Sequence, residues 1–460
     1  MAPNESARPS GYERGQQPPL IRCRLPGPLS LGFAARLEAA ESPAFGARRK
    51  SRAEVAGAEM SPIVYAAGEG SNLTDVDGNR YVDLAAGFGA LLLGHAPPKI
   101  ARALELQADR LWMALGDLYP SDTKVALVEK LAALYPEKGA RVLLGQSGSD
   151  AISAALKTAK LATGKPGVVA FEGAYHGLNY GPLAACGLKK SWREAFADQM
   201  NPHVAFIPYP RAAADLDRVL SLAEHALDAG NAGAVLVEPI LGRGGCVVPP
   251  PGFLRELAGL ARKADVLLVA DEIWTGLGRC GDWLASTAMG VRPDLICFGK
   301  GLGGGLPISA CVGPDGIMQS WRRETGDEVV HTATFHGAPL ACATAIATLD
   351  VLAAEGLGAR ARAVGDRARQ TLSNALAEVP GVGEVRGAGL MIGVELRAAS
   401  VALAVQRALL EAGYIVTLGG FLGEVVIITP ALTIDERLLD GFTAALRGLL
   451  EGAPSVGRTS

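Results

Sequence analysis

Five short and almost uninterrupted apolar runs constrain the fold of this chain more than any other feature. They are Arg141–Leu144, Val168–Phe171, Ala234–Val237, Val266–Ala270 and Leu295–Phe298. Runs of this length that do not alternate with polar residues are typical of strands buried on both faces of a parallel sheet. Helical periodicity fills the stretches between them. The pattern therefore predicts an α/β fold, with helices on both faces of the sheet.

The rest of the chain predicts a second, smaller domain in two pieces. Short apolar runs between Ile63 and Leu84 surround the turn signal Asp77-Gly78-Asn79, which predicts a small meander. Alternating helices and strands follow the long helix that begins at Pro339. The predicted division is an N-terminal extension (1–50), the small domain's first part (51–104), a large ligand-binding domain (105–350), the small domain's second part (351–452) and a tail (453–460).

The composition of the chain limits the kinds of partner that it is expected to bind. Of 460 residues, 49% are apolar and 20% are charged, and the formal net charge is −3. Without a strong basic field, a small molecule is a better expected partner than nucleic acid or a membrane surface. The seven cysteines contain no CxxC pair and the six histidines no HxxxH pair, so neither disulfides nor a metal site are expected. With no signal-peptide core near the start, a cytoplasmic location is expected.

Polar residues follow the first two apolar runs, at the sheet edge where open α/β proteins bind ligands. Ser147-Gly148-Ser149-Asp150 opens a helix, whose free N–H groups and dipole favour an anion such as phosphate. Tyr175-His176 follows the next run and offers an aromatic face for a planar ring. Taken singly, each is also typical of ordinary capping or packing.

An acid and a lysine follow the fourth and fifth runs. Asp271 needs a cation or a hydrogen-bond donor, because burying it unpaired is costly. Lys300 lies in a loop whose glycines allow close approach to a ligand. A dinucleotide-binding GxGxxG motif ends in Gly or Ala, whereas the run from Gly301 ends in Leu306. The lysine of a P-loop is followed by Ser or Thr, whereas Lys300 is followed by Gly301. Both motifs are therefore disfavoured. Together with the anion cradle and the aromatic face, the pair predicts pyridoxal 5'-phosphate (PLP) as cofactor.

These residues lie in segments that resemble a known family, the class III (ω-amino) aminotransferases of PLP fold type I. The resemblance spans about residues 65–450, and its most specific segments are SGSDAISAALKTAK, FEGAYHG, EPILGRGG, DEIWTGLGRCG, FGKGLGGGLP and HTATFHGAPLACA. The family includes 4-aminobutyrate and ornithine aminotransferases. The resemblance implies a large domain with a mostly parallel, seven-stranded type of sheet and a smaller α+β domain.

The resemblance also implies a role for individual residues. Lys300 matches the lysine that forms the internal aldimine, and Asp271 matches the partner of the pyridinium nitrogen. Residues implied to bind the cofactor as well are Gly148 and Ser149 at its phosphate, Tyr175 stacked on its ring, the adjacent His176, and Thr334, which in the family reaches the phosphate of the neighbouring subunit. The role of Thr334 implies a homodimer.

The chain departs from the family at its substrate pocket. Many members carry an arginine three residues before the proline of a late segment, where it grips the substrate α-carboxylate, and this chain has Ile427 there. Glu238 of the EP motif is a predicted catalytic residue. Because that arginine is absent, the expected partner of the Glu238 carboxylate is a substrate amine, Arg243 or water. Ala338 and Trp274 also replace residues that are usual in the family.

The predicted function is transfer of an amino group from an amine or ω-amino donor to a carbonyl acceptor, with Lys300 as the Schiff-base lysine. The alternatives on the same scaffold are a racemase, a decarboxylase, or an aminomutase similar to glutamate-1-semialdehyde aminomutase, which the GGGLP run also resembles. A PLP-sensing regulator would need a DNA-binding module, and residues 1–60 show no helix-turn-helix pattern.

Overall fold

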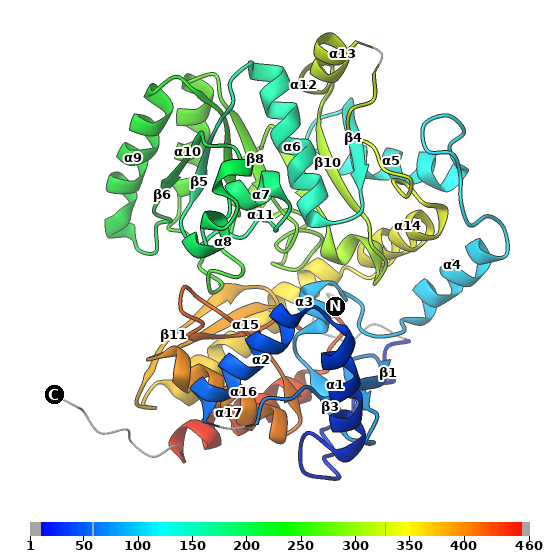
Figure 1. Ribbon diagram of the computed structural model, residues 1–460, viewed down its shortest axis with the longest axis vertical. Helices are drawn as coiled ribbons and strands as arrows, with labels where there is room; N and C mark the ends of the chain where they lie inside the picture. The colour runs from blue at the N-terminus through cyan, green and yellow to red at the C-terminus, as the bar shows by residue number, and fades with distance from the viewer. Residues whose placement is uncertain (1–10, 58, 327, 453–460) are drawn as a thin grey trace, which may run out of the picture.

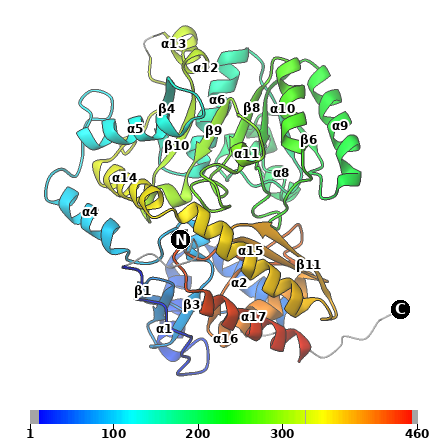
Figure 2. The same cartoon turned by 180° about the vertical axis from the view of Figure 1, so that it is seen from behind.

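The computed structural model describes residues 11–57, 59–326 and 328–452. Figure 1 shows two parts, one built around a large sheet from the middle of the chain and one built from both ends of the chain, coloured blue and orange to red. The same division is visible from behind in Figure 2, where α15 and α17 lie side by side. The exact predicted domain boundaries stay a prediction.

The large sheet has seven strands in the order β4-β10-β9-β8-β7-β5-β6. All neighbouring pairs are parallel except the two that β10 makes, with β4 and with β9. The mostly parallel seven-stranded sheet is therefore confirmed. Its strands are β4 (Ala140–Gly145), β5 (Gly167–Phe171), β6 (Val204–Ile207), β7 (Ala232–Val237), β8 (Leu267–Asp271), β9 (Leu295–Phe298) and β10 (Ser309–Pro314).

Burial on both faces explains why these strands have almost continuous apolar sequences. In β5, Val168 and Ala170 pack in one cluster with residues of α6 (Gly148–Thr163). Val169 and Phe171 point the other way, into a cluster with α9 (Leu216–Asp228) and α10 (Phe253–Lys263). Because successive side chains of a strand alternate between faces, a strand covered on both sides has no polar position.

The remaining helices surround the sheet and complete the second part. They are α3 (Ala86–Gly89), α4 (Pro98–Ala108), α5 (Asp122–Leu134), α7 (Tyr180–Ala184), α8 (Lys190–Glu194), α11 (Ala285–Ala288), α12 (Asp315–Met318), α13 (Ser320–Thr325), α14 (Pro339–Ala354), α15 (Leu357–Leu376), α16 (Ala399–Glu411) and α17 (Glu436–Glu451), with 3₁₀ turns at Ala197–Gln199, Ala213–Asp215 and Lys300–Gly303. Among the described residues no single helix is long and apolar enough to cross a membrane; only α14 and α15, bent by 66°, meet that test as a pair.

Two four-stranded sheets form the second part. The predicted meander is present as the antiparallel strands β1, β2 and β3, and β13 adds to β3 in parallel. The other sheet has the order β11-β12-β15-β14. The strands are β1 (Tyr65–Glu69), β2 (Asn72–Asp75), β3 (Arg80–Asp83), β11 (Val382–Ala388), β12 (Met391–Leu396), β13 (Tyr414–Ile415), β14 (Thr417–Gly419) and β15 (Val425–Ile428).

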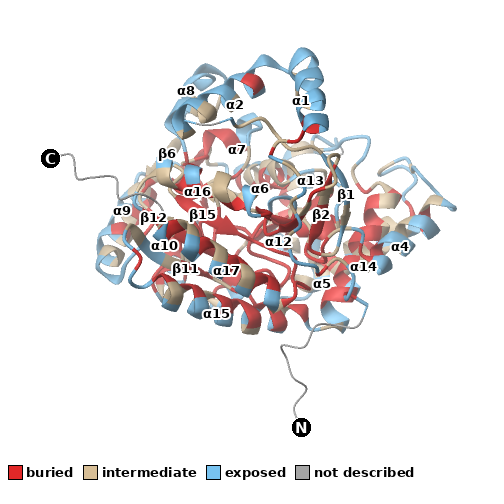
Figure 3. Cartoon of the chain, turned by 90° about the horizontal axis from the view of Figure 1, so that it is seen from below, coloured by how far each residue is buried: buried red, intermediate tan, exposed pale blue. Residues whose placement is uncertain are grey.

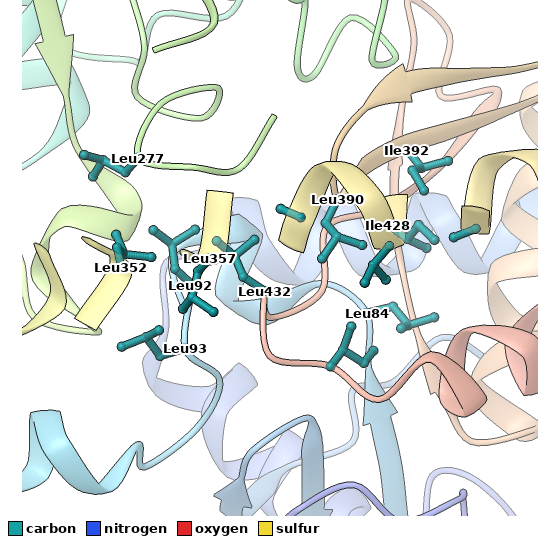
Figure 4. Close-up of a cluster of buried hydrophobic side chains, with 14 of the residues drawn as sticks. Leu84, Leu92, Leu93, Leu277, Leu352, Leu357, Leu390, Ile392, Ile428 and Leu432 are labelled. Carbon is teal, nitrogen blue, oxygen red and sulfur yellow. The ribbon is translucent and has the colours of Figure 1, made fainter. Parts of the chain in front are cut away.

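One apolar core joins the two parts. Figure 4 shows leucines and isoleucines of one buried cluster that come from the end of the meander, from α14 and α15, and from the late strands. Leu84 and Leu432 in this core are fully buried. In the N-terminal segment, α1 (Pro28–Ala40) begins against the turn between β2 and β3, and α2 (Pro43–Ala56) packs against α16. Figure 3 shows both helices to be largely exposed.

Candidate active site

Three neighbouring parallel strands end at the residues that the sequence analysis singled out. Asp271 is the last residue of β8, Glu238 follows β7, and Lys300 lies two residues beyond β9. The register pairs Asp271 with Cys297 of β9 and Ala270 with Val237 of β7, so the three strand ends lie at one edge of the sheet. The fold thus gathers two carboxylates and one amine where α/β proteins bind ligands.

Asp271 is held in place by its neighbours. Its side chain is buried; Oδ2 lies 2.7 Å from Nδ1 of His176, and Oδ1 accepts a 3.1 Å hydrogen bond from the backbone N–H of Ile273. The other ring nitrogen of His176 is buried and has no hydrogen-bond partner in the described part of the chain. His176, predicted to bind the cofactor, therefore contacts Asp271 directly and fixes its orientation.

Lys300 has the features of a reactive amine. Burial lowers the pKa of its amine to about 7, although Glu238 and Asp271 raise it. Its Nζ makes no hydrogen bond to the residues that the structure describes and lies 3.4 Å from the centroid of the Trp274 ring. The backbone of Lys300 has φ = +39°, a left-handed conformation that a non-glycine residue adopts only when its surroundings impose it.

Glu238 is buried and accepts two backbone hydrogen bonds, at 2.8 Å from the N–H of Tyr175 and at 2.9 Å from that of Gly242. Burial raises the pKa of Glu238 to about 7; His176 lowers it and Asp271 raises it. No arginine pairs with this carboxylate within the described residues. Glu238 and Lys300 can therefore both change protonation state near neutral pH.

The start of α6 could hold an anion. Ser147 caps the helix, with its Oγ accepting from the N–H of Asp150 at 3.2 Å, and the N–H groups of Gly148 and Ser149 have no acceptor within the helix. A Cβ at Gly148 would lie 2.9 Å from the Ile273 side chain, so the backbone there must stay bare. Ile273 belongs to the loop after β8, which brings this helix end beside Asp271.

Tyr175 and Thr334 lie in different surroundings. The ring of Tyr175 is covered by the guanidinium of Arg243, 4.5 Å from the ring centroid, and meets Trp192 edge to face at 6.2 Å. Thr334 is exposed, on a segment that is tied to α6 by a 2.8 Å contact between His336 Nε2 and Asp150 Oδ2. Thr334 therefore lies on the surface of the chain.

Ile427 lies on β15, fully buried in an apolar cluster that also contains Trp274, the residue whose ring contacts Lys300. The contact between Trp274 and Lys300 was not predicted. Its only sequence signal was a tryptophan close to Asp271, and nothing local indicated that its ring would turn toward the lysine.

Comparisons with known proteins agree with this geometry. The Aminotransferase class-III family profile matches residues 54–450. The acetylornithine aminotransferase of Mycolicibacterium smegmatis is 38% identical over 397 residues, which cover 85% of this chain and 94% of the relative. The alanine/serine racemase of Pyrococcus horikoshii is 33% identical, covering 86% of this chain and 88% of that protein.

A solved structure of ornithine aminotransferase from Toxoplasma gondii, with PLP partially occupying its active site, has a TM-score of 0.76 and 32% identity, covering 84% of this chain and 89% of that one. The fold and the relatives define a PLP-dependent enzyme of fold type I. Within that class, the chain belongs to the class-III aminotransferases and carries out PLP-dependent transamination.

The residues present fit this cofactor. The unpaired amine of Lys300 can bind an aldehyde covalently, and Asp271 can hold a positively charged ring nitrogen. The open N–H groups at the start of α6 suit a phosphate.

Proposed function

We propose that the enzyme takes an amino group from an amine or ω-amino donor and passes it to a carbonyl acceptor at a site built on Lys300 and Asp271. The observation that carries the proposal is an unpaired lysine amine of lowered pKa at the end of the strand next to a buried, oriented aspartate. Gly148, Ser149 and Tyr175 are proposed as further cofactor-binding residues, and Glu238 as a third catalytic residue.

The chain's own residues have separate tasks in this proposal. Bound PLP supplies an electron sink for the electron pair left at the substrate carbon. Asp271 keeps the ring nitrogen charged, and His176 keeps Asp271 oriented. Lys300, with a pKa of about 7, would take a proton from the substrate carbon, hold it on Nζ and give it back. The carboxylate of Glu238 would bind the amine of the substrate.

The preferred amino donor depends on Ile427, because its apolar side chain cannot pair with a carboxylate on the reacting carbon. We expect primary amines and ω-amino compounds to react faster than glutamate and alanine by about 100-fold or more, because an unpaired buried carboxylate costs several kcal/mol. The measurement is loss of the visible absorption of bound PLP in single half-reactions. Interconversion of alanine enantiomers, without conversion of the cofactor to its amine form, would instead indicate a racemase.

Fast reaction of glutamate that survives Arg243→Ala would show that Ile427 is a poor guide to the donor. If glutamate reacts fast only while Arg243 is present, that arginine replaces the missing carboxylate partner.

We further propose a homodimer in which Thr334 reaches the cofactor of the neighbouring subunit. Large apolar side chains are exposed on the loop that contains Trp112, Leu118 and Tyr119 and on the segment of Thr334, where Phe335 is 58% exposed. Apolar groups exposed together in this way are typical of protein interfaces.

Mixing two variant subunits tests this arrangement. A hybrid of Lys300→Ala and Thr334→Ala chains would contain one intact site if Thr334 acts across the interface, and none if it acts within its own chain. We expect mixing to recover PLP retention and activity above the level of either variant alone. A holoenzyme that sediments as a monomer would contradict the proposal.

A further inference from the structure

The indole ring of Trp274 lies directly against the amine of Lys300. Because Nζ is only 3.4 Å from the ring centroid, the amine lies over the face of the ring and not at its edge. An ammonium group in this position is attracted by the negative charge of the aromatic face. Within the described part of the chain, Nζ forms neither a hydrogen bond nor an ion pair. The ring therefore takes the place of a polar partner for the amine.

Two glycines leave the space that the indole occupies. A Cβ at Gly89 would lie 2.1 Å from the indole Nε1, and a Cβ at Gly242 would lie 2.4 Å from Cε3. These two atoms belong to the five-membered and the six-membered ring, so the glycines lie at opposite ends of the indole. A side chain at either position would displace the ring from the amine. The indole also packs with Met391 and Ile427 in one buried cluster.

A hydrogen bond does not set the position of this ring. Trp274 is 8% exposed, and its buried N–H has no acceptor among the residues that the structure describes. The N–H of a buried tryptophan usually finds an acceptor, because leaving it unpaired destabilises the fold. The indole of Trp274 is instead placed by the space between the two glycines and by its contact with the amine.

The carboxylates near Lys300 are bound to other groups. Both oxygens of Glu238 accept backbone N–H groups, and the two oxygens of Asp271 contact an imidazole nitrogen and a backbone N–H. Neither carboxylate forms an ion pair with the lysine, although both favour its charged form from a distance. The charges of Arg243 and Arg279 oppose that form. A charged amine at this position therefore has the indole as its direct contact.

We propose that Trp274 is a positioning residue for transamination: its ring holds the ε-ammonium group of Lys300 beside the reacting carbon while the lysine is not bonded to the cofactor. This inference rests on the proposed role of Lys300, which must keep a proton on Nζ between two transfers. Its flexible four-carbon chain could otherwise carry the charge away from the site. Once Nζ gives up the proton, the attraction to the ring weakens and the neutral amine is free to form a bond again.

The first test measures the pKa of the Lys300 amine in the holoenzyme. With the cofactor held as pyridoxamine phosphate the lysine is free, and trace acetylation at a series of pH values, read by mass spectrometry of the digested chain, gives its pKa. Trp274→Leu should lower this pKa by about one unit, because the ring favours the charged form. Trp274→Phe keeps an aromatic face and should lower it by about half a unit or less. Trp283→Leu, the same change at a partly exposed tryptophan, should leave it unchanged.

The direction of the shift separates a cation–π contact from a loss of packing. Burial is the largest cause of the lowered pKa of Lys300, so a cavity at position 274 that admits water would raise this pKa. The thiol of Cys246, in the same buried cluster, stays neutral because burial raises its pKa to about 12. An unchanged or raised pKa of Lys300 in Trp274→Leu, or an equal fall in Trp274→Phe, would overturn the inference.

A second measurement leaves the shape of the site almost unchanged. Fluorine withdraws electron density from the face of an indole, so biosynthetic replacement of tryptophan by its monofluoro and difluoro forms should lower the pKa of Lys300 in steps. Trp274→Phe carries the same fluorinated residues at every other tryptophan position and is the control, in which fluorination should have no effect. The inference fails if the wild type shows no such steps or if the control shows them as well.

The kinetic test follows the half-reaction of the pyridoxamine form with a carbonyl acceptor. In Trp274→Leu, kcat should fall about 10- to 100-fold while KM changes less than about threefold, because the position of the base is affected and not the binding of the acceptor. Trp274→Phe should restore most of kcat, and equal losses in the two variants would contradict the inference. If borohydride links the cofactor to another lysine, the proposed role of Lys300 is wrong. If it links the cofactor to Lys300 but the pKa of this lysine does not respond to position 274, the proposed function stands and the inference about Trp274 fails.

Discussion

Lys300→Ala is expected to lower transamination by at least about 10⁴-fold, because it removes both the covalent attachment point and the nearest base. The purified variant should lose the visible absorption of covalently bound PLP. The wild type, reduced with borohydride and digested, should give a single PLP-labelled peptide that contains Lys300. The basis is the position of this amine, unpaired and over Trp274, at the end of β9.

Lys190→Ala is the matched control, because this lysine is exposed on α8 and, among the described residues, forms an ion pair with Glu194 alone. It should keep native absorption and activity. A borohydride-stable link to another lysine in Lys300→Ala would show that the assignment of the cofactor lysine is wrong.

Asp271→Asn should keep PLP but lose activity by about 10²- to 10⁴-fold, since a neutral amide does not hold the ring nitrogen in its charged form. The amide can still meet His176 at the position of the present 2.7 Å contact, so the local structure should survive. Binding of PLP, measured by its absorption after gel filtration, and turnover should thus separate. Near-normal turnover would contradict the proposed role of Asp271.

Asp294→Asn offers a control at a carboxylate that contacts the same strand from the residue before β9. Asp294 accepts the N–H of Leu268 near the other end of β8, at 2.8 Å. This change removes a partly buried carboxylate without touching the site, so activity should stay within about twofold of the wild type, as is usual for substitutions remote from the chemistry.

The strands of the large sheet were predictable where burial on both faces requires an uninterrupted apolar sequence. The five apolar runs correspond to β4, β5, β7, β8 and β9. Strand β10 was not recognised, because Ser309 and Pro314 bound a short run of small residues, and its antiparallel insertion between β4 and β9 depends on distant pairing. Strand β6 has only four residues and lies at the edge of the sheet.

The helices of the N-terminal segment were missed for a related reason. The start of α1 is capped by Asp77, whose carboxylate oxygens accept the N–H groups of Leu29 at 2.8 Å and of Ser30 at 2.9 Å. A local cap would have been visible in the sequence, but this one comes from the turn between β2 and β3. The segment was therefore predicted only as an extension.

The strand ends of the site were predictable because chemistry-bearing residues follow directly after apolar runs. The contacts between the side chains of the site were not predictable. That Trp274 faces Lys300, that Arg243 covers Tyr175, and that two distant glycines leave room for the indole all depend on how separate segments pack. Such contacts join residues far apart in the chain, and no local pattern encodes them.

The parallel pairing of β3 with β13 has a consequence for the order in which the enzyme can be assembled on the ribosome. Residues of β3 leave the ribosome early, but Tyr414 and Ile415 of β13 follow only after the whole seven-stranded sheet has been synthesised. Domains generally fold as units as they emerge, so the large sheet can form while the meander still lacks its last strand. Apart from the bridge between Leu20 and Arg80, the edge of β3 that receives β13 must stay unpaired until then, which makes the nascent N-terminal part the stage at which a chaperone would be needed most.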